Sequence, residues 1–258
     1  MRQLLRLMLL TAVSGLVIAA TALPSQANAT NYTALGDSYS SGTGTREYFD
    51  EDCQKSKHAY PEQLAAEQGY ALNFAACSGA RIDDVRNNQL GGLNADTGLV
   101  TVSAGGNDTG WGDVVTQCAL PGANCIDDVE KAEAFIRDQL PGMLDGLYGD
   151  ISAAAPNAHV VVVTYPLLFN GEDCQAGTFF SGEEMEAMNS AAGLLDDTTA
   201  TVAANHGFAV ADPRDSFTGH AVCDGEEWVN GLSNPVSESF HPNQAGHDGY
   251  TTEVAGAL

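Results

Sequence analysis

Ser38 and His241 are side chains of the types that carry out nucleophilic catalysis together, although most of the chain lies between them. Ser38 lies among small residues in the segment 36–42, directly after the short apolar stretch 32–35. A serine hydroxyl is a weak nucleophile at neutral pH and needs a base, most often histidine, to take its proton. His241 precedes Pro242, which would stiffen its loop. The two residues therefore predict a nucleophile and its base.

Further residues could complete such a site. Glu238 lies three residues before His241 and could accept a hydrogen bond from the second ring nitrogen, which would fix the tautomer. A developing oxyanion needs hydrogen-bond donors, and the backbone N–H groups of Ser38 and Gly79 and the side chain of Asn107 are candidates. Ser38 and Asn107 are also ordinary turn formers and Gly79 could be a packing glycine beside Cys77, so the alternative is that they serve only local structure.

Alternating apolar stretches and helical patterns indicate an α/β fold. The expected strands cover residues 32–35, 72–75, 99–104, 160–163 and 208–211. The expected helices cover residues 61–68, 82–90, 127–147 with a kink or restart at Pro141, 181–207 with a capping box of Ser181 and Glu184, and 242–254. This order predicts parallel strands with helices on both faces. Residues 44–60, 109–126 and 213–237 are expected to be loops.

The predicted strands place three of the candidate residues at one edge of the sheet. Ser38, Gly79 and Asn107 each follow a strand directly. Sites in open parallel sheets form beyond the carboxyl ends of the strands. We therefore expect these three residues to lie near one another.

Residues 1–29 are typical of a secretory signal. Arg2 and Arg6 give a positive start, residues 7–23 are mostly apolar, and Ala27-Asn28-Ala29 fits a small-x-small cleavage site. An uncleaved anchor is the alternative, but the apolar stretch is short and no stop-transfer charges follow it. We expect residues 30–258 to form one secreted, extracellular domain without a stable membrane anchor.

The net charge of −24 restricts the possible partners. Nucleic acid is excluded because phosphate binding needs clustered lysines and arginines, and strongly anionic lipid surfaces should repel the chain. Adaptation to a salty or alkaline environment is one hypothesis for this charge. The acidic run 50–52 lacks the spaced ligands and glycine of a calcium loop, so we expect no metal there.

Six cysteines are present: Cys53, Cys77, Cys118, Cys125, Cys174 and Cys223. An even number in an exported chain favours disulfides, and six cysteines allow 15 pairings. We expect the sequential pairing, in which each bridge closes one loop region and contributes about 2–4 kcal/mol. A metal site is the alternative, but no C-x-x-C pair or close Cys/His pattern supports it.

Four blocks together resemble the SGNH hydrolase family, also called GDSL esterases and lipases. They are Gly36-Asp37-Ser38, Gly79, Gly106-Asn107-Asp108 and His241, in the family's order and at fitting spacing. The regions around Cys77 and His241 are more narrowly similar to secreted actinobacterial esterases, lipases and phospholipases. The resemblance implies a flavodoxin-like three-layer α/β/α sandwich, with a central five-stranded parallel sheet and three disulfides.

The resemblance also assigns roles. It implies that Ser38 is the nucleophile, that His241 is the base, and that Ser38, Gly79 and Asn107 form the oxyanion hole. Many members have aspartate where this chain has Glu238, and some secreted relatives use a backbone carbonyl instead, so a triad with Glu238 and a Ser-His dyad both stay open. Trp111 and Trp228 could line an acyl groove or pack in the core, and His247 is expected to be structural.

The sequence thus predicts a secreted serine esterase or lipase that acts as a monomer on small-molecule or lipid esters, without a metal or organic cofactor. The substrate class comes from the family resemblance alone. One alternative is a carbohydrate deacetylase of the acetylxylan type, which would act only on acetyl groups. Another is a non-catalytic binding protein on an esterase scaffold.

Overall fold

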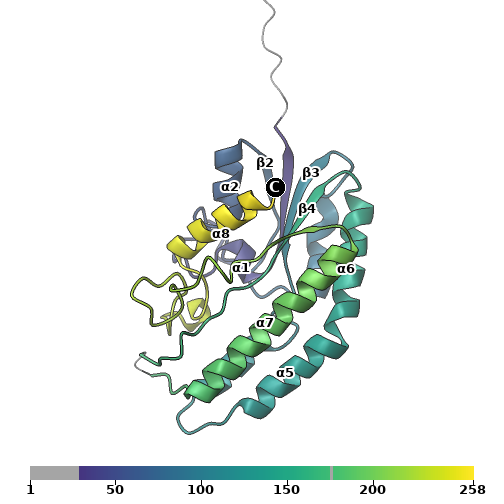
Figure 1. Cartoon of the computed structure of the whole chain (residues 1–258). Coiled ribbons are helices and arrows are strands. Elements are labelled where there is room, and N and C mark those ends of the chain that lie inside the picture. Colours follow the sequence, from purple (N-terminus) through teal and green to yellow (C-terminus); the bar gives the residue numbers. More distant parts are fainter. Residues whose placement is uncertain (1–28, 175–176) are drawn as a thin grey trace, which may run out of the picture.

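A five-stranded parallel sheet forms the centre of the computed structural model, which describes residues 29–174 and 177–258. The sheet has the order β2-β1-β3-β4-β5, as Figure 1 shows. The strands are β1 (Asn31–Gly36), β2 (Ala71–Phe74), β3 (Thr97–Ser103), β4 (His159–Val163) and β5 (Ala209–Ala211). The five strands predicted from the sequence are confirmed. The signal predicted for residues 1–29 falls, except for its last residue, outside the described residues.

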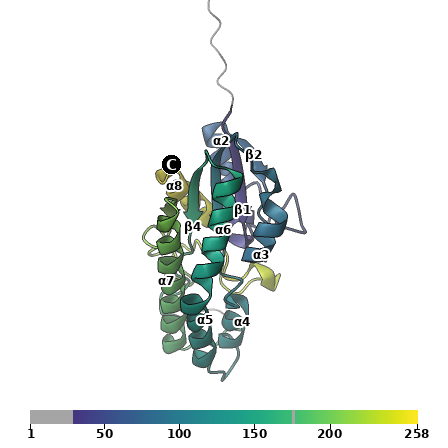
Figure 2. The same ribbon diagram turned by 90° about the vertical axis from the view of Figure 1, so that its right-hand side faces the viewer.

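Helices cover both faces of the sheet (Figures 1 and 2). Helices α2 (Tyr60–Gln68) and α8 (Gln244–Gly256) pack together on one face. The other face carries α3 (Ile82–Asp84), α5 (Ile126–Asp138), α6 (Leu140–Ala154) and α7 (Gly182–Asn205). The short helices are α1 (Ser38–Ser41), α4 (Trp111–Cys118), the π-helix η1 (Val85–Gln89) and the 3-10 helices η2 (Leu90–Gly92) and η3 (Val236–Glu238). The predicted three-layer α/β/α sandwich is confirmed.

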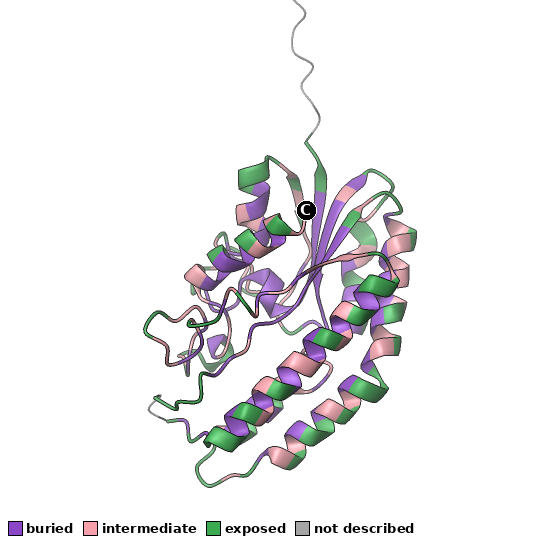
Figure 3. Ribbon diagram, viewed as in Figure 1, coloured by how far each residue is buried: buried purple, intermediate pink, exposed green. Residues whose placement is uncertain are grey.

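The central strands are buried on both faces (Figure 3). Val161 and Val162 are fully buried in neighbouring positions of β4, which explains why this strand is a continuous apolar run rather than an alternating one. The helices instead show buried and exposed sides, with the buried side toward the sheet. The hydrophobic core therefore lies in two layers, one on each side of the sheet.

Several predicted boundaries differ from the structure. The restart predicted at Pro141 is confirmed, but the two helices extend beyond the predicted 127–147, from Ile126 to Asp138 and from Leu140 to Ala154. The last helix begins at Gln244, because the side chain of Asn243 caps it by accepting from the Gly246 N–H. The loop predicted over 109–126 is wrong in part, since it contains α4. Glycines in and beside its first turn masked its short apolar face.

Three disulfides join Cys53 to Cys77, Cys118 to Cys125 and Cys174 to Cys223. The predicted sequential pairing is confirmed. Within the described residues, no helix is both long enough and apolar enough to cross a bilayer.

Candidate active site

The turn from β1 into α1 presents Ser38 at the carboxyl edge of the sheet. Asp37 caps α1, since its Oδ1 accepts from the Tyr39 N–H at 3.0 Å. Gly36 lies just before the turn with φ +128°, and a Cβ there would meet the carbonyl oxygen of Ser103 at 2.5 Å. A glycine is therefore required for the close approach of β1 to the end of β3.

Ser38 and His241 are brought together in the structure. Nε2 of His241 lies 2.8 Å from Oγ of Ser38, and Nδ1 lies 2.9 Å from the backbone carbonyl of Ser239. A carbonyl can only accept a hydrogen bond, so Nδ1 carries the ring proton. Nε2 is then unprotonated and accepts the hydrogen bond from the Ser38 hydroxyl. This is the tautomer that a general base for Ser38 needs.

The surroundings of His241 favour the neutral ring. Burial lowers the pKa of His241 from 6.5 to about 4, and the hydrogen bond to Ser239 only partly opposes this shift. The imidazole is thus an available proton acceptor at neutral pH.

Glu238 does not take the position expected of a triad member. Its side chain is 2% exposed, and its Oε1 accepts from the Tyr48 hydroxyl at 2.8 Å. Its Oε2 lies 3.3 Å from Nε of Arg46. The sequence left open whether Glu238 or a backbone carbonyl contacts Nδ1 of His241, and the structure has the carbonyl of Ser239 there. The carboxylate is held by the 46–48 loop, and the Ser239 carbonyl takes the place at Nδ1.

Ser38, Gly79 and Asn107 are the residues that the sequence predicts as oxyanion donors. In the part of the chain that the structure describes, the N–H groups of Ser38 and Gly79 have no protein acceptor. Gly79 has φ +79°, a left-handed conformation that suits glycine. Nδ2 of Asn107 donates one hydrogen to the carbonyl of Ala80 at 3.0 Å, which leaves its second hydrogen for a ligand. The three predicted donors thus lie in turns that leave hydrogens available.

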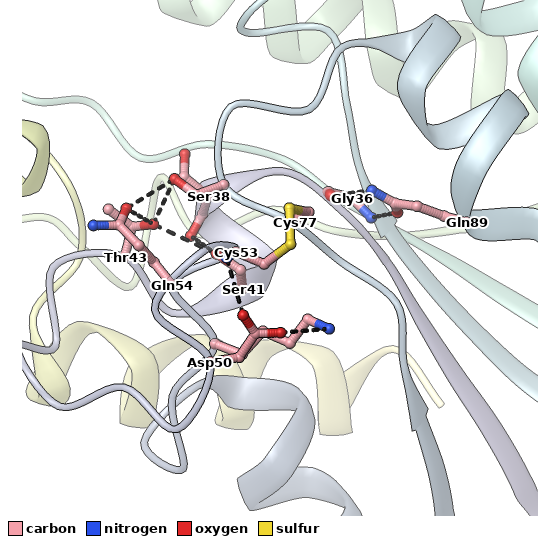
Figure 4. The surroundings of a disulfide bond; sticks show 11 residues. Gly36, Ser38, Ser41, Thr43, Asp50, Cys53, Gln54, Cys77 and Gln89 are labelled. Carbon is pink, nitrogen blue, oxygen red and sulfur yellow. Dashed lines mark hydrogen bonds and ion pairs between the residues drawn. A yellow bond between two sulfur atoms is a disulfide. The ribbon is translucent and has the colours of Figure 1, made fainter.

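The turn that carries Gly79 is fixed by the Cys53–Cys77 disulfide and its neighbours (Figure 4). The Ser78 N–H donates to the carbonyl of Cys53 at 3.0 Å, and the Ser78 hydroxyl donates to Oε1 of Gln54 at 2.9 Å.

The same figure shows Gln89 paired with the end of β1. Its amide accepts from the Gly36 N–H at 2.7 Å and donates to the Gly36 carbonyl at 2.9 Å.

The sequence analysis missed a buried polar network beneath Ser38, which is centred on Asp37. The carboxylate of Asp37 is 1% exposed and accepts from the hydroxyls of Ser103 at 2.8 Å and Tyr165 at 2.6 Å. Burial raises the pKa of Asp37 to about 6 despite these hydrogen bonds. Ser103 and Tyr165 each stand at or just past the end of a strand, which is the available sequence signal for this network.

A pocket of about 480 Å³ opens beside Ser38. Its wall is mostly apolar and combines α4, α7 and the loop before His241, with Trp111, Val115, Ala192, Leu195, Leu232 and Phe240 among its residues. Trp111 is therefore part of this pocket.

Trp228 is outside the pocket and stacks on His220, with ring centroids 3.9 Å apart. His247 is fully buried and its Nδ1 accepts from the Tyr60 N–H at 3.4 Å, in agreement with a structural role.

A parallel sheet with a serine hydroxyl in contact with a histidine ring at its carboxyl edge is typical of a class of hydrolases. A family model described as the GDSL-like Lipase/Acylhydrolase family matches residues 34–248. The chain belongs to this family, and it is a carboxylic ester hydrolase of the esterase or lipase kind.

Curated relatives agree with this assignment. Lipase 1 of Streptomyces coelicolor is 44% identical over 251 residues, which cover 94% of this chain and 92% of that protein. A lipase of Streptomyces rimosus is 43% identical over 223 residues, which cover 84% of this chain and 82% of that protein.

Two solved structures have the same fold over most of their length. The extracellular lipase of Streptomyces rimosus superposes with a TM-score of 0.84 at 41% identity and covers 89% of this chain and 100% of that chain. Phospholipase A1 of Streptomyces albidoflavus superposes with a TM-score of 0.85 at 42% identity, with the same coverage.

Proposed function

We propose that this ester hydrolase works through a Ser38–His241 dyad and an acyl-enzyme intermediate. Oγ of Ser38 attacks the ester carbonyl carbon while Nε2 of His241 takes the hydroxyl proton. The carbonyl oxygen becomes an oxyanion that accepts from the Ser38 N–H, the Gly79 N–H and the Asn107 amide. Nε2 then gives its proton to the oxygen of the leaving alcohol as the carbon–oxygen bond breaks.

In the second half of the cycle, water is the nucleophile and Oγ of Ser38 is the leaving group. Water attacks the acyl-enzyme while Nε2 of His241 takes a proton from it, and Nε2 then gives this proton to Oγ of Ser38 as the acid leaves. The carbonyl of Ser239 stabilises the transient imidazolium through its hydrogen bond to Nδ1. The observation that carries the proposal is the 2.8 Å contact between Ser38 Oγ and His241 Nε2, in the tautomer that makes Nε2 the acceptor.

The apolar pocket supports an acyl chain as the substrate portion bound beside Ser38. A volume of about 480 Å³ accommodates a chain of several carbons, whereas an acetyl group would leave most of the apolar wall uncovered. This favours lipid or other long-chain esters over the acetylated carbohydrates considered as an alternative. The names of the relatives, lipases and a phospholipase A1, point to the same class.

We further propose that the protein acts as a secreted monomer. Support for export comes from the signal pattern of residues 1–29, the three disulfides and the extracellular lipase among the similar structures. The charge of −24 argues against nucleic acid as a partner and against strongly anionic lipid surfaces.

The test is a panel of nitrophenyl esters from acetate to palmitate, measured on the wild type and on Ser38→Ala, together with labelling by a fluorophosphonate. We expect turnover that favours chains longer than acetate, covalent labelling at Ser38, and loss of both in Ser38→Ala. Activity confined to acetate would favour the deacetylase. Turnover that persists in Ser38→Ala would refute the dyad.

A further inference from the structure

Tyr39, the residue directly after Ser38, reaches the loop that carries His241. Its hydroxyl donates to the backbone carbonyl of Phe240 at 2.7 Å. Its ring also lies against the His241 imidazole, with centroids 5.2 Å apart and planes tilted by 40°. The residues on either side of the Ser38–His241 contact are thus joined by a second hydrogen bond.

The backbone that Tyr39 holds has an uncommon conformation. Phe240 has φ +58°, in the left-handed region that a bulky residue seldom adopts. The backbone groups on either side of the Phe240 carbonyl are hydrogen-bonded as well. The Phe240 N–H donates to the carbonyl of Asn230, and the carbonyl of His241 accepts from the Asn230 N–H, both at 2.9 Å. The Phe240 carbonyl depends on Tyr39 for its hydrogen bond, since no other donor to it exists among the described residues.

Tyr39 is itself well anchored. Its N–H is bound by the Asp37 carboxylate, and its ring packs edge-on against Tyr165 at 5.0 Å. Burial and the nearby carboxylate raise the pKa of Tyr39, so the phenol keeps its proton and stays a donor. Through Tyr39, the short helix α1 therefore connects Ser38 to the loop that carries His241.

From these contacts we propose that Tyr39 is a positioning residue for the ester hydrolysis, holding the Phe240 carbonyl so that the imidazole of His241 stays within proton-transfer distance of Ser38. The inference rests on the proposed Ser38–His241 dyad and adds a residue that determines its geometry. Without the phenol hydroxyl, the Phe240 carbonyl loses its hydrogen-bond donor and the backbone at Phe240 can relax from its left-handed conformation. The ring nitrogen then leaves Oγ for part of the time.

The test compares Tyr39→Phe with Tyr250→Phe. The matched control keeps the edge-on contact of the Tyr250 ring with Tyr39, with centroids 6.5 Å apart, and removes only a buried hydroxyl that donates to the Thr164 carbonyl at 3.0 Å. We expect Tyr39→Phe to lower kcat and the rate of fluorophosphonate labelling by about tenfold each, with KM for a short ester unchanged within about twofold. Tyr250→Phe should lower the melting temperature while kcat stays at the wild-type value.

A spectroscopic readout separates this inference from the proposed function. The Nδ1–H resonance of His241, assigned by its loss in His241→Gln, should shift or broaden in Tyr39→Phe and stay unchanged in Tyr250→Phe. It reports the ring position whether or not ester turnover is detected. An unchanged resonance, or a Tyr39→Phe enzyme with wild-type kcat and labelling, would overturn the proposal. A wild type that neither turns over esters nor labels would instead refute the dyad.

Discussion

The backbone carbonyl of Ser239 lies 2.9 Å from Nδ1 of His241 and fills the place that a triad carboxylate would take. A carbonyl orients the ring and fixes its tautomer as a carboxylate does, but it carries only a partial charge. The imidazolium formed during turnover is therefore stabilised by a dipole, and the neutral ring is favoured in the resting protein.

Glu238→Gln should consequently leave the chemistry nearly intact. The glutamine oxygen can still accept from the Tyr48 hydroxyl, while the ion pair with Arg46 is lost. We expect kcat to stay within about threefold of the wild type and the melting temperature to fall slightly. Ester assays and thermal unfolding of both proteins check this. A loss of several hundredfold in kcat would restore Glu238 as a member of a triad.

Asn107→Ala should lower kcat while it leaves KM nearly unchanged. The amide hydrogen that Ala80 does not use is proposed to bind the oxyanion only as it develops, so removal costs about 10²- to 10³-fold in kcat. Asn107→Asp is the matched variant, since it keeps the size of the side chain and replaces the donor by an acceptor. Similar losses in both variants support the role. A decrease below about threefold in Asn107→Ala would exclude it.

The acid limb of the pH–rate profile should lie well below the ordinary range of histidine. Because the pKa of His241 is lowered to about 4, kcat/KM should rise as pH increases through about 4 and be level at neutral pH. The measurement is kcat/KM for a short ester between about pH 3.5 and pH 8, with folding checked at each pH. An acid limb near 6.5 or above would contradict the buried, neutral imidazole.

Asp37 should make the protein less stable as pH rises through the weakly acidic range. Its carboxyl titrates near 3.8 when unfolded and at about 6 in the fold, so the folded state binds the proton more tightly. The stability linked to this proton is complete below pH 3.8 and is lost as pH rises through about 6, an effect of about 3 kcal/mol.

Asp37→Asn removes this titration. The free energy of unfolding of the variant, measured in urea relative to the wild type, should increase between about pH 4 and pH 7. The difference between the two proteins cancels contributions from other titrating groups. A difference that stays constant with pH would show that folding does not raise the pKa of Asp37.

Ala192→Leu should shorten the preferred acyl chain. Ala192 lies in α7 and lines the pocket, so the larger side chain occupies space that we assign to the acyl chain. We expect kcat/KM for octanoate to fall about tenfold relative to acetate. Ala204→Leu, at an exposed position of the same helix, is the control. Equal changes for both esters would place the acyl chain elsewhere.

Local patterns in the chain are enough to predict the elements and the residue types of the site. Strands, the capping box at Ser181 and the helix restart at Pro141 follow from patterns that act over a few residues. The four blocks around Ser38, Gly79, Asn107 and His241 are equally local, and each follows a strand or precedes a helix. Their convergence at one edge then follows from parallel strand order.

The group that holds His241 and the size of the site depend instead on how distant segments pack. Every residue has a carbonyl, so no sequence pattern marks Ser239, whereas Glu238 stood out by its chemistry and is turned away toward Tyr48. The pocket wall joins α4, α7 and a distant loop that share no local pattern. Likewise the raised pKa of Asp37 comes from its burial, in a place that only the packing of two other strand ends against β1 creates. Such contacts depend on how distant segments pack, which short-range patterns do not specify.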